Sequence, residues 1–489
     1  MCPIHFLLNP KTMSTLTAPA PSVAIPDLFA RQQQRSLTLR HEPVAKRITR
    51  LKQLKGWIQT HRLDIQQAIY QDFKKPTFET DTSEVLVCLQ ELDFAIKNLS
   101  RWARDQRVST PITLPGTTGY IRYEPKGVCL IIAPWNYPFQ LLVGPWISAI
   151  AAGNCAVLKP SEMTPHTAEL IERMVTELFP TNEAAVVPGD KEVAQELLSH
   201  PFDHIFFTGS PAVGKHVMTA AAKHLSSVTL ELGGKSPAIV DETADLAVAA
   251  EKIAWGKFFN GGQTCIAPDY VLVHKSIHDE LVGRLITTVR KMYNPDGRGM
   301  QHSPDYARIV NRSHTERLVE MLNQGVARGA TVALGGEHAV DEHYLAPTLL
   351  TEVPEDTDLM QEEIFGPLLP IRSYRTLSEV VDYVNAKPKP LTLYMFTEDQ
   401  ANREYVLQCT SSGGAAINEC IMQFSHPHLP FGGVNHSGIG KAGGHHGFLA
   451  FSNEKSVFRQ LWGNKITRFL LPPVSTKLKE RLGWVIRNF

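Results

Sequence analysis

From Val128 onward the chain repeats one pattern: a short apolar run that ends in Gly, Pro or Asn, followed by a stretch in which apolar residues recur at helical spacing. The runs are VCLIIAPW, NCAVLKP, AAVVPG, DHIFFTG and VTLELGG. Short apolar runs bounded by turn residues are typical of buried strands, and strands that alternate with helices form parallel sheets. The pattern therefore predicts an α/β fold built on a parallel sheet.

A second series of strand–helix units follows Gly234 and runs to about Asn418, with helices predicted near Ile277–Met292 and Pro304–Arg328. This series predicts a second α/β domain. The length of 489 residues agrees, because it exceeds the size of one ordinary domain.

Two further segments precede the first sheet. Apolar residues recur at spacings of three and four through Leu28–Gln106, which predicts a helical lead-in. Arg107–Lys126 has the Thr/Ile/Tyr alternation of an extended hairpin, which we interpret as an arm that pairs with another subunit.

Charge and cysteine content narrow the class of partner. Lysine plus arginine equals aspartate plus glutamate, 49 each, so no overall field would attract nucleic acid or an anionic membrane, and a small-molecule partner is expected. The seven cysteines are scattered, which argues against a disulfide framework and a CxxC zinc site and favours a cytoplasmic location. They are Cys2, Cys88, Cys129, Cys155, Cys265, Cys409 and Cys420.

The first residues do not form a secretory signal, because no lysine or arginine precedes the short apolar patch in MCPIHFLLNP. We predict a disordered extension over residues 1–22, with either Met1 or Met13 as the start. No run of 18 apolar residues follows, so no transmembrane segment is predicted.

Ligands of open α/β sheets bind at the carboxyl ends of the strands, which makes the residues after each apolar run candidates for function. Taken singly, each also fits a turn or a solvated surface position. The candidates are Trp135 and Asn136, then Lys159, Ser161 and Glu162, then Gly209–Gly214, and finally Glu231.

The segment Gly209-Ser-Pro-Ala-Val-Gly214 lacks the middle glycine of the GxGxxG dinucleotide fingerprint. A glycine-rich turn into a helix still offers free backbone N–H groups and the positive end of the helix dipole to a phosphate. An ordinary helix start capped by Ser210 explains the same letters equally well.

Cys265 lies in FFNGGQTCIAP, at the apparent start of an element rather than within an apolar stripe. A thiolate there would attack a carbonyl carbon, a nearby amide such as Asn136 would stabilise the oxyanion, and a carboxylate such as Glu231 would activate water. Most cysteines are buried and inert, so this interpretation depends on the neighbouring residues.

Seven segments in one order resemble the aldehyde dehydrogenase superfamily from about Val23 to Val457. They are PWNYPF, KPSE, FTGS with a second glycine five residues on, LELGGKSP, GGQTC, EEIFGP and LPFGG. PWNYPF and LELGGKSP are most similar to the class 3 and fatty aldehyde dehydrogenase branch. The resemblance implies the aldehyde dehydrogenase fold: a Rossmann-type nucleotide-binding domain, an α/β catalytic domain and a small β arm for oligomerisation.

For catalysis, the resemblance implies that Cys265 is the nucleophile and that Asn136, with the Cys265 N–H, holds the oxyanion. Glu231 would activate the water that hydrolyses the thioester, giving a carboxylic acid. An aldehyde, medium- or long-chain aliphatic or aromatic, is the expected substrate.

For the cofactor, the resemblance implies NAD, with NADP also accepted. Glu162 near the ribose hydroxyls would disfavour a 2′-phosphate, which Lys159 would partly neutralise. The implied cofactor residues are Trp135, Lys159, Ser161, Glu162, Gly209, Ser210, Gly214, Leu232, Glu363 and Phe365.

Tyr137 and Phe431 suit an apolar aldehyde by offering flat hydrophobic walls, although core packing explains Tyr137 equally well. The histidines around LPFGG have irregular spacing, and we predict no metal site. They are His426, His428, His436, His445 and His446.

The tail after the signature segments mixes apolar and basic residues at helical spacing. Pro472-Pro473 breaks it, so a short helix that covers the partner subunit or the substrate entrance is favoured over weak binding to a membrane surface. The branch resemblance implies a homodimer.

The predicted organisation is a nucleotide-binding domain of residues 23–106 and 127–232, a catalytic domain of residues 233–418, an arm of residues 107–126 and 419–460, and a tail of residues 461–489. Two other functions compete with the dehydrogenase. A cysteine hydrolase would pair Cys265 with a histidine base. A binding protein on an inactivated scaffold would be expected to have lost Cys265, Asn136 or Glu231, and all three are present.

Overall fold

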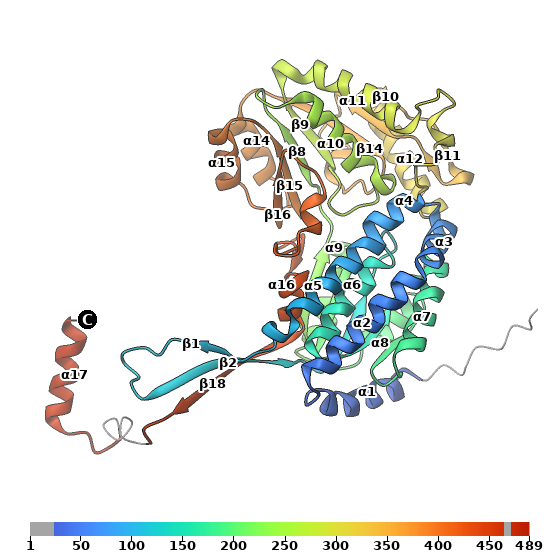
Figure 1. Ribbon diagram of the computed structural model, residues 1–489. Coiled ribbons are helices and arrows are strands. Elements are labelled where there is room, and N and C mark those ends of the chain that lie inside the picture. The colour runs from blue at the N-terminus through green and yellow to red at the C-terminus, as the bar shows by residue number, and fades with distance from the viewer. Residues whose placement is uncertain (1–23, 464–470, 489) are drawn as a thin grey trace, which may run out of the picture.

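The computed structural model describes residues 24–463 and 471–488, which form two α/β lobes and a projecting arm (Figure 1). The extension predicted over residues 1–22 and both candidate starts lie outside the described residues. Among the residues that are described, no helix combines the length and the apolar character needed to cross a membrane.

The first lobe is built on a six-stranded sheet in the order β17-β7-β6-β3-β4-β5. All five predicted strands are present and parallel, whereas the short β17 runs antiparallel to β7. The strands are β3 (Val128–Ile132), β4 (Cys155–Lys159), β5 (Ala184–Val186), β6 (His204–Gly209), β7 (Ser227–Leu232) and β17 (Gly438–Ile439).

Both faces of this sheet are covered, which explains why β3 is apolar at every position. Val128 and Leu130 face one hydrophobic cluster, and Cys129 and Ile131 face another. The first is closed by α1 (Ile25–Leu39), α8 (Lys191–Leu198) and α9 (Pro211–Ala222). The second is closed by α2 (Val44–Thr60), α3 (Arg62–Phe73), α5 (Leu86–Trp102), α6 (Gln140–Ala152) and α7 (Pro165–Leu178).

The predicted helical lead-in is confirmed, with the short α4 (Thr77–Thr80) between α3 and α5. Its predicted end at Gln106 is wrong, because the helix ends at Trp102 and Gln106 already pairs with Ile121 in the arm.

The second lobe holds a seven-stranded sheet in the order β10-β13-β14-β9-β8-β15-β16, parallel except for β10. Helices α10 (Leu246–Phe258) and α11 (His278–Tyr293) cover one face, and α13 (Asp358–Gln361), α14 (Leu377–Asn385) and α15 (Gln400–Cys409) cover the other. The strands are β8 (Pro237–Val240), β9 (Tyr270–His274), β10 (Thr331–Leu334), β13 (Thr348–Thr351), β14 (Leu368–Tyr374), β15 (Thr392–Phe396) and β16 (Gly414–Ile417), and a separate pair comprises β11 (His338–Ala339) and β12 (Tyr344–Leu345). The predicted second α/β domain and its helix near Ile277–Met292 are thus present.

The helix predicted over Pro304–Arg328 begins later than expected, as α12 (Arg312–Ala327). The Asn311 side chain caps it by accepting a hydrogen bond from the His314 N–H at 2.9 Å. The preceding residues are held by other parts of the chain, because Arg308 N–H donates to the Phe73 carbonyl at 3.0 Å and Ile309 N–H donates to the His343 carbonyl at 2.9 Å.

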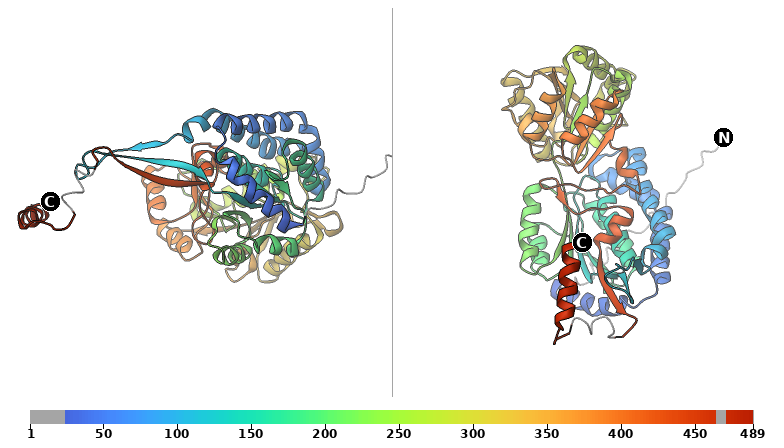
Figure 2. Two further views of the ribbon diagram at one scale, coloured as in Figure 1. Left: turned by 90° about the horizontal axis from the view of Figure 1, so that it is seen from below. Right: turned by 90° about the vertical axis from the view of Figure 1, so that its left-hand side faces the viewer.

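The arm is a three-stranded antiparallel sheet of β1 (Gln106–Val108), β2 (Thr117–Pro125) and β18 (Ser452–Gln460), which confirms the predicted hairpin. Figures 1 and 2 show it reaching away from both lobes, with α17 (Thr476–Asn488) beyond its tip.

The segment 419–460, predicted to belong entirely to the arm, is divided. Only β18 pairs in the arm, whereas β17 joins the first sheet and α16 (Gly444–Ala450) packs beside α6 and α5. Gly438 explains why, because a Cβ there would lie 2.3 Å from the Leu230 carbonyl oxygen. Only a glycine lets this segment approach β7 so closely.

We predict that Gly438→Ala lowers the free energy of unfolding by at least about 2 kcal/mol, because it combines a strained φ of 149° with the contact to Leu230. Gly283→Ala on α11 is the control. It meets nothing within 4 Å and should raise stability by about 0.5 to 1 kcal/mol. Urea unfolding midpoints measure both, and an unchanged midpoint for Gly438→Ala would contradict the prediction.

Candidate active site

The carboxyl ends of the first sheet face the loop that carries Cys265 from the second lobe. Asn136 follows β3, Glu231 lies near the end of β7, and Cys265 precedes β9. The charge of Glu231 acts on the Cys265 thiol. The Asn136 side chain bonds to the Gln263 carbonyl, two residues before that thiol. The structure therefore brings the three predicted catalytic residues together.

The Cys265 loop has an unusual backbone. In the turn η2 (Phe259–Gly262), Asn260 has φ 56° and Gly261 has φ 63°. A Cβ on Gly262 would lie 2.4 Å from the Gly366 carbonyl oxygen, so the GG of GGQTC allows the loop to pack against EEIFGP. The Gln263 side chain then fixes the loop, since its amide donates to the Asn260 and Arg308 carbonyls at 2.9 and 3.0 Å.

Asn136 is oriented by the same loop. The Asn136 side-chain Nδ2 donates to the Gln263 backbone carbonyl at 3.0 Å. The Asn136 backbone carbonyl accepts from Asn260 Nδ2 at 2.9 Å. An amide nitrogen carries two hydrogens, so one remains available after this bond. Asn136 is 2 % exposed. The geometry is that of a fixed donor for an oxyanion.

Glu231 is buried, and both of its carboxylate oxygens have no hydrogen-bond partner among the described residues. Burial raises the pKa of this carboxyl well above its ordinary value, and the Lys441 ammonium opposes part of the shift. Two unsatisfied oxygens in a buried carboxyl are costly unless they serve a ligand or a water. A raised pKa suits a general base that works near neutral pH.

Cys265 is half-buried, and burial raises the pKa of its thiol to about 12, with further contributions from the charges of Glu363 and then Glu231. The thiol is therefore neutral at pH 7 in this state. Because the thiolate is the nucleophile, attack requires that a positive charge approach or that a neighbouring base accept the proton.

Two of the predicted cofactor residues, Ser161 and Glu162, line a hollow of about 190 Å³ beyond β4 together with Pro188 and Gly189. Lys159 Nζ lies 3.2 Å from Glu162 Oε2, with the lysine buried and the carboxylate half exposed. The Ser161 hydroxyl accepts from the Met163 N–H at 3.2 Å and so shapes the turn. An exposed carboxylate at this position fits ribose hydroxyls.

The Gly209–Gly214 turn agrees with both interpretations of its sequence. Ser210 caps α9 and accepts from the Val213 N–H at 3.4 Å, while the open N-terminus of the helix offers backbone donors. Gly209 is paired with Leu232 across the sheet. A Cβ on Gly214 would lie 2.7 Å from the Leu232 side chain, so this glycine permits the close packing of α9 on β7.

Three further predicted cofactor residues, Trp135, Glu363 and Phe365, lie on the loops that follow β3 and precede β14. The rings of Trp135 and Phe365 lie edge to face with centroids 5.4 Å apart. Burial and then the Asp269 charge raise the pKa of Glu363 to about 8. Asp269 also accepts the Ile364 N–H at 2.9 Å, which docks the EEIFGP loop against the start of β9.

The two predicted substrate residues have different surroundings. Tyr137 is buried, and its hydroxyl bonds to Thr264 Oγ1 at 2.6 Å. Phe431 is half-buried and meets Phe424 edge to face at 4.9 Å.

Sequence reasoning did not find Lys75, whose Nζ lies 4.0 Å from the Tyr137 ring centroid. A fully buried ion pair with Glu84 at 2.9 Å holds it. A KK dipeptide at the end of an amphipathic helix resembles a solvated surface, so no sequence signal marks Lys75 as buried. The sequence analysis also did not identify Lys441, whose charge acts on the Glu231 carboxyl.

Two of the five histidines around LPFGG pack against aromatic rings: His428 meets Phe94, and His445 stacks on Phe448. Within residues 24–463 and 471–488, no group of three or more His, Cys, Asp or Glu is arranged to hold a metal ion. The six cysteines in these ranges are all free, and Cys2 lies outside them.

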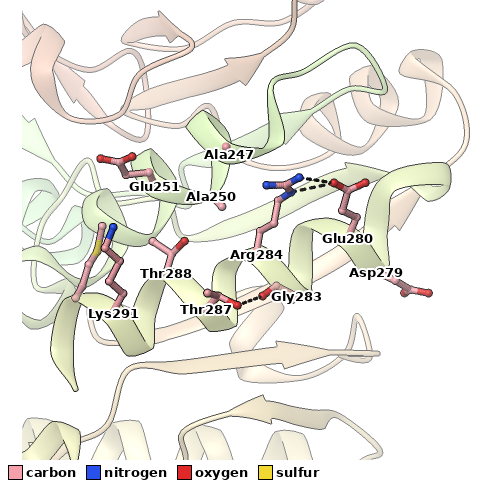
Figure 3. A pocket seen from close by; sticks show the side chains of 11 residues that line it. Ala247, Ala250, Glu251, Asp279, Glu280, Gly283, Arg284, Thr287, Thr288 and Lys291 are labelled. Carbon is pink, nitrogen blue, oxygen red and sulfur yellow. Dashed lines mark hydrogen bonds and ion pairs between the residues drawn. The ribbon is translucent and has the colours of Figure 1, made fainter. Parts of the chain in front are cut away.

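A surface hollow of about 830 Å³ lies between α10 and α11 (Figure 3). Glu280 and Arg284 pair on its rim at 2.8 Å. It contains none of the predicted site residues.

Residues 22–457 match the aldehyde dehydrogenase family, and the chain belongs to that family of oxidoreductases. It is 46% identical to the 4,4'-diaponeurosporen-aldehyde dehydrogenase of Staphylococcus aureus, over 92% of this chain and 95% of that protein. It is 42% identical to aldehyde dehydrogenase family 3 member B3 of Mus musculus, over 90% of each. The class 3 resemblance is thereby confirmed.

Solved structures agree in fold. The substrate-bound Staphylococcus aureus AldH has a TM-score of 0.89 at 44% identity, covering 94% of this chain and 99% of its own. An indole-3-acetaldehyde dehydrogenase complexed with NAD+ has a TM-score of 0.82 at 26% identity, covering 89% and 88%. A glyceraldehyde-3-phosphate dehydrogenase from Methanocaldococcus jannaschii complexed with NADP has a TM-score of 0.80 at 25% identity, covering 89% and 94%. The family oxidises aldehydes to acids with NAD or NADP.

We predict that alkylation of Cys265 by iodoacetamide, in a Cys409→Ser background that removes an exposed thiol, accelerates about tenfold per pH unit from roughly pH 7 to pH 10 without a plateau. Glu363→Gln should accelerate it above about pH 8, where that carboxylate is charged. Exposed Glu362→Gln is the control. A plateau near the ordinary pKa of a thiol would contradict the raised value.

Proposed function

We propose that the enzyme oxidises medium- or long-chain aliphatic or aromatic aldehydes to carboxylic acids through a thioester on Cys265. The observation that carries this proposal is the buried Glu231, whose charge acts on the Cys265 thiol and whose two carboxylate oxygens have no hydrogen-bond partner within residues 24–463 and 471–488. A carboxylate placed in this way beside a thioester would accept a proton from water.

The first step forms a thiohemiacetal. The Cys265 thiol first loses its proton to water. The sulfur then attacks the aldehyde carbon, the carbonyl π electrons move to oxygen, and Asn136 Nδ2 with the Cys265 N–H donates to the oxyanion. Because Asn136 is already held by Gln263, the donor needs no reorganisation when the charge forms.

Bound NAD or NADP would supply the hydride acceptor that converts the thiohemiacetal to a thioester. Lys159, Glu162 and the Gly209–Ser210 turn would hold its adenosine and pyrophosphate parts. Glu363, with Trp135 and Phe365 beside it, would orient the nicotinamide end. Ser161, Gly214 and Leu232 would shape the same surface.

Hydrolysis returns the enzyme to its initial state. Glu231 accepts a proton from water, the water oxygen attacks the thioester carbon, and the C–S bond breaks to release the acid and the Cys265 thiolate. The thiolate then takes the proton from Glu231, which restores the neutral thiol and the carboxylate. A neutral Glu231 would be inactive as a base, so this step should accelerate as pH rises through its pKa.

We propose that NAD is preferred over NADP. Glu162 extends half exposed at the hollow beyond β4, and Glu169 and Glu172 also line it. These carboxylates would repel a 2′-phosphate, although Lys159 at 3.2 Å from Glu162 offsets part of that repulsion. The ratio of kcat/KM for the two cofactors measures the preference.

The aldehyde class rests on the apolar surroundings of the site. Phe431 and Phe424 pack together beside Met422 and Leu429, which are each 50 % exposed. Such surfaces favour apolar chains or rings, with Tyr137 as an inner wall. The Staphylococcus aureus relative is named for 4,4'-diaponeurosporen-aldehyde, so this long apolar aldehyde is a further candidate substrate to test.

We predict that the enzyme forms NADH when it is given acetaldehyde, decanal or benzaldehyde, and that the rate is highest with the two more apolar aldehydes. Cys265→Ala should abolish NADH formation. Glu231→Gln should give a burst and then turn over about 10²- to 10⁴-fold more slowly, because only hydrolysis is lost. Cys409→Ser, which alters an exposed cysteine, is the control. Absence of reduction with every aldehyde and both cofactors would overturn the proposal.

We also propose a cytoplasmic homodimer. Six free cysteines fit a reducing compartment. The arm projects from the lobes and exposes Phe458, Leu461 and Trp462 by 62, 54 and 57 %. Apolar side chains on a strand edge favour a second subunit, and the apolar residues of α17, among them Leu482 and Trp484, extend the same region.

Sedimentation should therefore give twice the mass of the 54.4 kDa chain, and Phe458→Asp should weaken association at least about tenfold. Leu63→Asp, equally exposed but on α3, is the control. A wild-type monomer at micromolar concentration would contradict the dimer. Co-sedimentation with anionic vesicles would instead support a membrane role for α17.

A further inference from the structure

Lys441 lies between β17 and α16, and its ammonium is fixed by backbone carbonyls. Nζ donates to the carbonyl oxygens of Gly432, Gly433 and Gly413, at 2.5, 3.2 and 3.3 Å. An ammonium has three hydrogens, so these bonds use all of its donors. The neighbouring Ala442 pairs with Phe431 through two backbone hydrogen bonds, which anchors this segment on LPFGG.

The same segment closes over Glu231. A Cβ placed on Gly432 would lie 2.9 Å from Glu231 Oε1 and 3.0 Å from Lys441 Cδ. The carboxylate and the lysine side chain therefore approach each other across the bare Cα of Gly432. On the other side, Gly438 of β17 is paired with Glu231 itself.

One charged side chain, that of Lys441, acts on the Glu231 carboxyl and opposes the effect of burial on its pKa. Lys441 contributes the positive charge. The Cys265 thiol is neutral or negative, and Glu231 raises its pKa. Burial lowers the pKa of Lys441, while the charge of Glu231 raises it. Lys441 is thus the group that favours ionisation of a carboxylate that accepts no hydrogen bond from the part of the chain that the structure describes.

We propose that Lys441 is a positioning residue for the hydrolytic step: its ammonium, held on three carbonyl oxygens, favours the ionised form of the nearby Glu231 carboxyl while leaving both carboxylate oxygens free for water. This inference rests on the proposed role of Glu231 as the base. Among the described residues, no ion pair joins the two side chains, although the short path across Gly432 brings them close.

The absence of a direct contact is useful for the base. A lysine bonded to the carboxylate would occupy the oxygen that must accept a proton. Held on carbonyl oxygens instead, the ammonium acts through space. A positive charge in a partly buried site is weakly screened, so it favours the ionised form of a nearby carboxyl.

Hydrolysis of p-nitrophenyl acetate isolates the step without cofactor. Acylation of Cys265 releases nitrophenolate in a burst, and the later steady rate reports attack of water on the acyl enzyme. We expect Lys441→Met to shift the acid limb of the steady rate to higher pH by about one unit, so that the rate falls about tenfold below the pKa and recovers at high pH. The burst should be unchanged.

Two matched variants separate charge from hydrogen bonding. Lys441→Gln keeps N–H donors for the carbonyls but carries no charge, so it should shift the profile as Lys441→Met does. Lys441→Arg keeps the charge and should restore the wild-type limb. A profile lowered equally at every pH, or a wild-type limb in Lys441→Gln, would overturn the proposal because it would indicate a purely structural role.

Glu231→Gln separates this inference from the proposed function. If Glu231→Gln hydrolyses the acyl enzyme at the wild-type rate, the base assignment itself fails. If Glu231→Gln stalls but Lys441→Met keeps the wild-type limb, only the role of Lys441 fails. Infrared spectra give a readout besides activity: the protonated carboxyl band that is lost in Glu231→Gln should persist to higher pH in Lys441→Met.

Discussion

The site depends on a small set of hydrogen bonds between side-chain amides and backbone carbonyls that join the two lobes. Asn136, from the end of β3, and Asn260, from the Cys265 loop, both donate to the Gln263 carbonyl. Each lobe has its own hydrophobic clusters, so neither core fixes the distance between the oxyanion donor and the nucleophile. These buried bonds do so, and in a low-dielectric interior they tolerate little displacement.

Electrostatics imposes an order on the chemistry. Cys265, Glu231 and Glu363 all become negative on ionisation, and burial raises the pKa of each. Like charges at short range in a buried site do not ionise together readily. In the proposed mechanism the thiolate is consumed when the thioester forms, and that removes one of the charges before Glu231 acts. The three groups can therefore be mostly neutral at rest, while Cys265 and then Glu231 ionise in succession as the proposed reaction proceeds.

Much of this architecture was predictable because it depends on local pattern. The five strands from VCLIIAPW to VTLELGG have apolar runs bounded by turn residues, and all five form the first sheet. What failed depended on distant contacts. The start of α12 is set by bonds from Arg308 and Ile309 to other segments, and β17 joins the first sheet because Gly438 can approach Leu230.

The catalytic candidates were found through ordered motifs, whereas their supporting residues were not. Lys75 and Lys441 resemble ordinary surface lysines in sequence, yet one lies buried on the Tyr137 ring and the other beside Glu231. A single sequence carries no signal for a lysine whose partners are carbonyl oxygens or an aromatic face. Only the fold identifies them.

The contact between the helical lead-in and the Cys265 loop also constrains when activity appears during folding. Glu79 accepts the Asn260 N–H at 2.9 Å, and Glu84 accepts the N–H groups of Phe139 and Gln140 at 3.0 Å. These bonds join positions separated by up to 181 residues, so they form only after long loops close. The contacts around Cys265 consequently form late in folding. In a partly folded chain this cysteine is not yet placed beside Asn136 and Glu231.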